Sequence, residues 1–271
     1  TQATDSNKAL KVRNNSSTDT FNVSYKGQGY FAGKVGIGTT NPSTYKLHLQ
    51  GSASALARFE RTGGAFAKVD IKAGSSSGNS YLTFSDTDAS EVGHLNYEHA
   101  DNSLRVIVNS NERLRINSDG YITKPYHPSF CARQQSGDGY VSTDIFRLTL
   151  VNNDNFSWNT GGHYSTSTGK FTAPVAGVYY FEGQAMTTGH SNGDNIQDML
   201  QLRTNNGLVT YARQRRTYFR TEDDANGYYT NSTAGQVNLA AGDTVWFQRA
   251  PGKSFGFGNT NYTYFTGWLI G

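Results

Sequence analysis

"NTGGHYSTSTGKFTAPVAGVYYFEGQ", residues 159–184, holds the pattern that decides how the C-terminal half of the chain folds. The run from Val178 to Phe181 is apolar or aromatic at every position, so both faces of an extended chain carry large side chains. A strand that is apolar on both faces lies inside a sandwich or against a neighbouring subunit. Pro174 stands before it in a turn, where no ladder N–H is required. The stretch therefore predicts a central strand of an all-β domain.

Two later stretches supply more strands of the same domain. "AGDTVWFQ" (residues 241–248) and the closing "YFTGWLIG" (residues 264–271) are both rich in apolar and aromatic residues. A domain of about 140 residues buries roughly two thirds of its extended surface, which is enough for it to fold alone. We expect its core to include Val245, Phe247, Phe265, Trp268 and Ile270.

The central stretch also has a distinctive spacing of Asn159, Tyr164, Phe171, Gly177, Tyr179 and Phe181. This spacing resembles that of complement C1q-like domains, in the wider C1q and tumour-necrosis-factor superfamily. Two positions depart from the family pattern, because Asn153 and Gly183 stand where aromatic residues are expected. The resemblance covers about residues 129–271. It implies a jelly-roll β-sandwich that forms a tight homotrimer, with aromatic strands packed along the threefold axis.

The N-terminal region has a different pattern, seen best in "YFAGKVGIGTTNPSTYKLHLQG", residues 30–51. Gly36, Gly38 and Pro42 interrupt an apolar run at a spacing that no helix tolerates, which predicts two short strands joined by a tight turn. With the later "ERLRINSDG", the block resembles the shaft modules of bacteriophage tail fibres and tail spikes. That resemblance covers roughly residues 10–122 and implies a trimer whose chains pack these strands about a common axis, ahead of a receptor-binding tip.

An imperfect internal repeat runs through the same region. Residues 9–31 and residues 103–122 each have Leu, a basic residue and Val, then an Asn/Ser turn, an alternating strand, and Gly before an aromatic–apolar pair. Chance similarity between hairpins is the alternative to a true repeat. Between the copies, alternating segments bounded by turn residues predict strands at residues 46–49, 56–61, 67–73, 81–85, 92–97 and 103–108.

Two of the five prolines cluster in "TKPYHPSF", residues 123–130, and the composition changes after them. Proline restricts its own backbone and that of the preceding residue, which predicts a stiff linker. We therefore divide the all-β chain into a β-rich shaft or shoulder region (1–123), a linker (124–129) and a C1q-like receptor-binding knob (130–271).

Composition excludes several classes of protein. The net charge of +3 is small for 271 residues and argues against a nucleic-acid binder. Cys131 is the single cysteine, so no intramolecular disulfide can form. No stretch approaches the ~20 apolar residues of a membrane span, so we expect no membrane insertion. The polar start, without Met or an apolar leader segment, suggests a piece of a longer polypeptide.

Motifs of catalysis and metal binding are missing or lack their structural context. The sequence contains no HExxH, P-loop or CxxC motif, and the six histidines are scattered. Three segments match GxSxG, at residues 74–78, 189–193 and 252–256, but they lie in turn-rich stretches without the strand–turn–helix pattern that the motif requires. A Ca²⁺ site at Glu222, Asp223 and Asp224 is possible in principle, but a solvated loop is the simpler interpretation. A carboxylate pair for glycoside hydrolysis cannot be located in a sequence, so that activity stays open. We predict no enzyme activity, no cofactor and no metal.

Long loops in the second half mix aromatic with polar side chains, as recognition surfaces on a rigid sandwich do. Aromatic faces stack on sugar rings, while Asn, Asp and Arg hydrogen-bond sugar hydroxyls. The alternative for each aromatic residue is a place in the domain or trimer core, and Trp158 is ambiguous in the same way. The candidate glycan contacts are Arg215, Arg216, Tyr218, Tyr228, Phe255, Phe257 and Tyr262.

From these patterns and resemblances we predict the distal part of a homotrimeric bacteriophage tail fibre, extracellular on the virion. It would bind a host-surface receptor, a polysaccharide, with avidity from several weak sites. A missing N-terminal region would attach it to the virion tail or baseplate. The alternatives are a polysaccharide-degrading tail spike and a secreted C1q-like bacterial adhesin.

Overall fold

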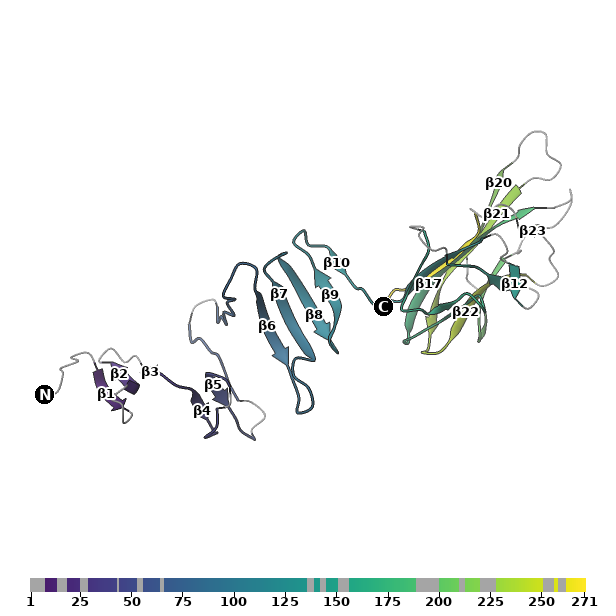
Figure 1. The fold of residues 1–271 in the computed structure, drawn as a ribbon. Helices are drawn as coiled ribbons and strands as arrows, with labels where there is room; N and C mark the ends of the chain where they lie inside the picture. Colours follow the sequence, from purple (N-terminus) through teal and green to yellow (C-terminus); the bar gives the residue numbers. More distant parts are fainter. Residues whose placement is uncertain are drawn as a thin grey trace. The chain divides into compact units, whose positions relative to one another are not determined.

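In the computed structural model, the elements of regular secondary structure among the described residues are β-strands (Figure 1). It divides into two compact units, Thr1–Lys72 and Ala73–Gly271, which are described one at a time. Within the residues described, no helix is long and apolar enough to cross a membrane. The predicted boundaries at residues 123 and 129 stay a prediction. The structure describes residues 8–13, 19–24, 29–42, 44–52, 56–63, 66–135, 139–141, 145–150, 156–188, 200–209, 213–219, 228–250, 256–257 and 262–271.

The first unit contains a three-stranded antiparallel sheet and a separate pair of strands. The sheet has the order β1 (Lys8–Arg13), β2 (Asp19–Ser24) and β3 (Gly29–Phe31). The pair consists of β4 (Val35–Ile37) and β5 (Leu47–Leu49).

β4 and β5 run parallel, with Val35 opposite Leu47. Parallel neighbours require the chain to cross from the end of one strand to the start of the next. Residues 38–46 make this crossing, so the predicted tight turn between two strands is wrong. Gly38 has a positive φ of 78°, and a Cβ there would collide with the carbonyl oxygen of Gln50, which explains the glycine.

Two of the predicted strands, at residues 56–61 and 67–73, lie outside any strand. Their alternating pattern is present, and Phe59, Phe66 and Val69 are exposed. A strand also needs a hydrogen-bonding neighbour, which the described residues of this one chain do not provide.

The second unit begins with a five-stranded antiparallel sheet, in the order β10-β9-β8-β7-β6. Its strands lie side by side in one layer (Figure 1). The bounds of β6 and β7 match predicted segments within two residues, and β8 matches its segment fully; β9 and β10 lie in the second copy of the repeat, for which no strand bounds were predicted. They are β6 (Asn79–Phe84), β7 (Gly93–Glu98), β8 (Ser103–Val108), β9 (Asn111–Ile116) and β10 (Ile122–Thr123).

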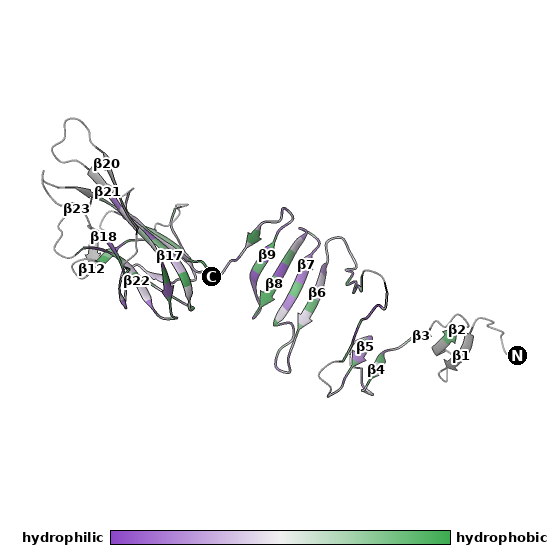
Figure 2. Cartoon of the chain, turned by 180° about the vertical axis from the view of Figure 1, so that it is seen from behind, coloured by the Kyte–Doolittle hydropathy of each residue, from purple (hydrophilic) through white to green (hydrophobic). Residues whose placement is uncertain are grey.

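Residues paired across an antiparallel sheet share a face, and most large apolar side chains here lie on one face, with Ser80 and Asn111 as its polar members. Leu82 pairs with Leu95, and Leu95 with Val106, so one row crosses three strands. Hydrophobic and hydrophilic residues alternate along these strands (Figure 2). The face that we call the apolar face consists of Leu82, Phe84, Leu95, Tyr97, Leu104, Val106, Val108, Leu114, Ile116 and Ile122.

The charges of this sheet form one network away from the apolar face. Arg105 pairs with Asp101 at 2.7 Å, and Arg115 pairs with Glu112 at 2.8 Å and with Asp101 at 3.5 Å. The hydrogen bond from Arg115 holds the pKa of Glu112 below its usual value. The hydrogen bond with Ser103, followed by those with the arginines, lowers the pKa of Asp101.

The two copies of the sequence repeat form the same three-stranded meander. In the first copy Val12 pairs with Phe21, and in the second Val106 pairs with Leu114. In each copy the third strand pairs with the second.

The rest of the second unit is a two-layer sandwich of antiparallel strands. The layer that we call the β17 sheet has the order β14 (Trp158–Thr160), β11 (Ser129–Arg133), β24 (Tyr264–Leu269), β17 (Gly177–Thr188), β21 (Tyr228–Leu239) and β20 (Arg213–Phe219), and β23 (Gly256–Phe257) also pairs with β17. The β22 sheet has the order β12 (Gly139–Val141), β13 (Ile145–Arg147), β22 (Thr244–Arg249), β16 (Lys170–Thr172) and β15 (Tyr164–Ser165), and β18 (Leu200–Thr204) pairs with β22 and with β19 (Gly207–Leu208).

The core between these layers is aromatic. Phe130 lies at its centre, stacked on Tyr164 with ring centroids 4.8 Å apart and on Phe171 at 5.2 Å. Phe181 and Phe265 close the cluster from the β17 sheet. All five residues are buried, and three of them, Tyr164, Phe171 and Phe181, belong to the spacing on which the C1q resemblance rests.

Local hydrogen bonds explain two more positions of that spacing. The Asn159 side chain brackets the Tyr164 backbone, accepting from its N–H at 3.0 Å and donating to its carbonyl at 2.8 Å. The Tyr164 hydroxyl reaches Leu148, donating to its carbonyl and accepting from its N–H, both at 3.1 Å. At Gly183, where an aromatic residue was expected, the Phe247 ring occupies the place of a side chain.

Candidate interaction surface

The outer face of the β17 sheet carries several large aromatic side chains that lie outside the core of the sandwich. Tyr180 of β17 is paired with Trp268 of β24, and their ring centroids are 4.6 Å apart. Trp158, Trp268 and Ile270 are 45%, 41% and 48% exposed. Aromatic residues with few charges among them are typical of the centre of a protein interface.

A carboxylate lies among these aromatic side chains. Glu182 accepts a hydrogen bond from the Tyr264 hydroxyl at 2.8 Å and one from the Tyr180 hydroxyl at 3.2 Å. Burial, and then the hydrogen bond with Glu182, raises the pKa of Tyr264 strongly, so this hydroxyl stays protonated and keeps donating. The three side chains of the cluster therefore pair with one another.

Two expectations from the sequence are wrong here. Trp268 and Ile270 were expected in the core, but both lie on the outside of the sandwich because they alternate with Gly267 and Leu269, which face inward. The ambiguous Trp158 also lies outside. The other expected core residues, Val245, Phe247 and Phe265, are buried.

Five of the seven candidate glycan contacts lie on strands of the β17 sheet. Tyr218 pairs with Tyr229, which pairs with Thr187, and Thr187 pairs on its other side with Phe257, so one backbone row joins four strands. The positions of Tyr228, Arg215 and Arg216 lie along the same β20–β21 hairpin.

The side chains of the five candidates on these strands, Arg215, Arg216, Tyr218, Tyr228 and Phe257, are not described. Phe255 lies outside the described residues, as do Glu222, Asp223 and Asp224. Tyr262 is exposed, and its carbonyl accepts a hydrogen bond from the Gln184 amide at 3.1 Å. Binding at the seven candidate residues stays a prediction.

Sequence reasoning missed the Tyr180–Glu182–Tyr264 cluster. The alternation of large side chains on both faces of residues 178–181 pointed to a contact with something outside the strand. However, Tyr264 is 82 residues from Glu182, and only the register of β17 with β24 brings the two together.

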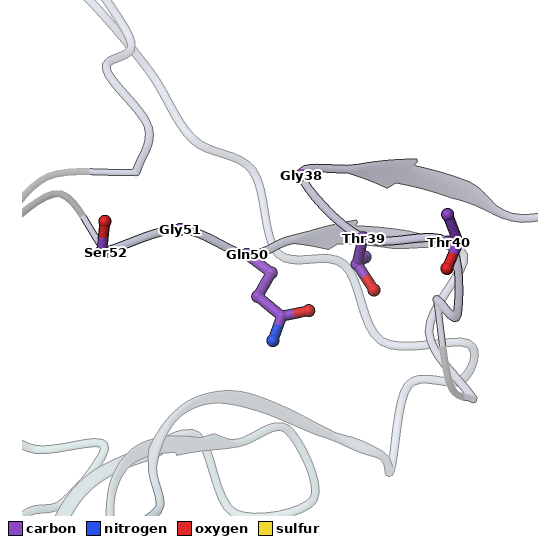
Figure 3. A pocket seen from close by; sticks show the side chains of 6 residues that line it. All are labelled: Gly38, Thr39, Thr40, Gln50, Gly51 and Ser52. Carbon is purple, nitrogen blue, oxygen red and sulfur yellow. The ribbon is translucent and has the colours of Figure 1, made fainter.

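The first unit has an open hollow beside the end of β5 (Figure 3). Backbone and small uncharged side chains line it, from Gly38, Thr39, Thr40, Gln50, Gly51 and Ser52. The Thr39 hydroxyl takes part in the local turn, where it accepts a hydrogen bond from the Asn41 N–H at 3.2 Å. In the part of the chain that the structure describes, no three His, Cys, Asp or Glu residues gather at a metal-binding distance.

Comparison with known proteins places a C1q domain at residues 140–270. Complement C1q and tumor necrosis factor-related protein 9 of Mus musculus is 33% identical over 120 residues, which are 43% of this chain and 32% of that protein. Complement C1q and tumor necrosis factor-related protein 9A of Homo sapiens is 32% identical over 120 residues, which are again 43% of this chain and 32% of that protein. The chain thus spans about a third of the length of these relatives. The globular domain of zebrafish complement 1qA matches 54% of this chain and 98% of its own, at 21% identity and a TM-score of 0.34.

These findings confirm an all-β chain with a C1q-like jelly roll. They overturn the prediction of a bacteriophage tail fibre and of a place on the virion, because the curated relatives are C1q and tumor necrosis factor-related proteins of mouse and human. Nothing supports the phage shaft resemblance, the virion tail and host-receptor partners, or the bacterial adhesin alternative.

Proposed function

We propose that this chain is a non-enzymatic binding protein that assembles as a homotrimer through the outer face of the β17 sheet. Its C1q domain would carry the contacts to a ligand. A homotrimer is the assembly that the C1q resemblance implies.

One observation carries the assembly proposal. Trp158, Trp268 and Ile270 lie exposed on the outer face of the sandwich, and the core between the two sheets is filled without them. The Tyr180 and Tyr264 hydroxyls are already satisfied by Glu182, so a partner that covers this face leaves no polar group of the cluster unpaired.

Size-exclusion chromatography with light scattering measures the mass of the assembled chain in solution and so tests the proposal. Trp268→Asp places a charge on the face and should reduce the measured mass to that of one chain. Thr172→Asp, on the exposed side of β16 in the other layer, is the matched control and should leave the assembly intact. A wild-type chain that elutes as a monomer at micromolar concentration contradicts the proposal. So does a Trp268→Asp chain that stays folded and assembled.

The ligand site that we propose consists of the seven candidate residues, five on β20, β21 and β23, together with Phe255 and Tyr262. Its support is the backbone row that joins Tyr218 and Phe257 across the β17 sheet. Loss of one stacking aromatic should weaken sugar binding about three- to tenfold, equal to about 0.5–1.5 kcal/mol. Binding of a panel of soluble glycans to Tyr218→Ala, with Thr172→Ala as control, checks this. If the Tyr218→Ala and Thr172→Ala variants bind the glycans equally well, the proposed site is contradicted.

A further inference from the structure

The apolar face of the five-stranded sheet is uncovered in the single chain. Leu82, Leu95 and Ile122 are 50%, 40% and 59% exposed, although they lie on three different strands. These exposures show that none of the described residues packs over the face. A sheet that is hydrophobic on one face must bury that face against another element.

The uncovered area is large. Seven side chains of the apolar face are 38–59% exposed. At roughly 200 Å² for each large apolar side chain, they leave on the order of 700 Å² open. That exceeds the patch of about 300–600 Å² that soluble monomers ordinarily show, and it approaches the ~800 Å² per partner of a stable interface.

The positions of the charged side chains indicate what kind of partner fits the apolar face. The charges of Arg105 and Arg115 are paired with Asp101 and Glu112 on or beside the polar face. The apolar face itself holds no charged side chain. A partner for it must therefore be apolar and uncharged as well, and the same face of another copy meets both conditions.

The chain connectivity favours another copy over an unrelated protein. β10 ends at Thr123 and β11 of the sandwich begins at Ser129. The five residues between them reach at most about 20 Å. Trimerisation of the C1q domain would thus hold three copies of the sheet near one another at an effective concentration of about millimolar.

We infer that the apolar faces of the five-stranded sheets, Asn79 to Thr123, pack against one another in the assembled protein, as a homotypic interface separate from that of the C1q domain. The inference rests on the proposed homotrimer for the number of copies. The polar face with the Arg105–Arg115 network then remains toward solvent.

Thiol labelling of the full-length chain tests the inference. Leu95→Cys and Thr83→Cys are made separately in a Cys131→Ser chain, and each is treated with a maleimide reagent under native conditions. Leu95 belongs to the apolar face, whereas Thr83 pairs with His94 on the other face and is exposed. We expect Leu95→Cys to react at least about tenfold more slowly, because labelling then requires local opening. A short bismaleimide should cross-link Leu95→Cys chains to one another and leave Thr83→Cys chains separate.

The outcomes separate this inference from the proposed function. If the chain is trimeric and Leu95→Cys reacts as fast as Thr83→Cys, the inference is overturned and the C1q-mediated trimer remains. If Leu95→Cys is protected in a chain that sediments as a monomer, another segment of the same chain covers the face, and both proposals are overturned. Protection together with cross-linking in a trimer supports both.

Discussion

In the sandwich, Phe130 and Phe181 lie between two sheets and are fully buried, whereas in the five-stranded sheet Leu82 and Leu95 are about half exposed. Both regions alternate apolar and polar residues along their strands, so their sequences obey the same rule. The two regions differ in the number of sheets that pack together. The sandwich has a second sheet from its own chain, whereas none of the residues that the structure describes covers the five-stranded sheet. Alternation therefore predicts an apolar face without revealing whether the same chain covers it.

The largest expected effect is in the sandwich core. Phe130→Ala removes the ring that stacks on Tyr164 and Phe171, and should cost about 3–5 kcal/mol of unfolding free energy. Because the core is intramolecular, the loss should be the same at low and high protein concentration. Urea unfolding followed by circular dichroism at two concentrations measures it. A loss that depends on concentration would show that the sandwich also needs a partner to fold.

A smaller effect distinguishes the covered from the uncovered state of the five-stranded sheet. Leu95→Ala should cost about 2–3 kcal/mol per chain if other copies cover the apolar face, since the change then leaves a cavity. The cost should be within about 0.5 kcal/mol if the face meets water. Urea unfolding at high protein concentration decides between these values, with Thr83→Ala as the matched control for the exposed state.

The tyrosine cluster on the β17 sheet predicts a loss of stability in alkali. The pKa of Tyr264 is raised in the folded protein above its ordinary value of 10.0, so its contribution is fully present below pH 10 and decreases as the pH rises further. Tyr264→Phe removes the bond to Glu182, should cost about 1–2 kcal/mol at neutral pH, and should flatten the decline above pH 10. Thermal unfolding between pH 8 and 11 checks this, and an unchanged slope in the variant contradicts the assignment.

The smallest effect belongs to the charge network of the five-stranded sheet. The pKa of Glu112 is lowered in the folded protein, so its contribution is present above its ordinary value of 4.5 and is lost as the pH falls below it. Arg115→Gln should cost only about 0.5–1 kcal/mol at neutral pH, because the pair is partly exposed. It should also reduce the acid sensitivity of the amides of residues 103–116 in hydrogen exchange. An equal sensitivity in both proteins would assign the effect to other carboxylates.

Much of the fold could be predicted from residues in the sequence, and the exceptions share one physical cause. The spacing of Asn159, Tyr164 and Phe171 led to the C1q-like sandwich, and alternation located β8. Pairing partners could not be predicted. The parallel pairing of β4 with β5 and the outward direction of Trp268 depend on contacts that a local pattern does not contain.

The candidate site shows the same division. Aromatic and arginine residues in the loops suggested Tyr218 and Phe257, which the register brings into one row of the β17 sheet. The Tyr180–Glu182–Tyr264 cluster could not be predicted, because its parts come from strands distant in the sequence. The identity of the relatives also could not be read from the N-terminal pattern, whose resemblance to phage shafts was misleading.

Sedimentation equilibrium of the unmodified full-length chain tests most directly whether its exposed apolar faces are covered by further copies. The account predicts a particle of three times the 29.7 kDa of one chain, unchanged on dilution through the micromolar range. A stable, soluble particle of a single chain at the same concentrations would contradict it.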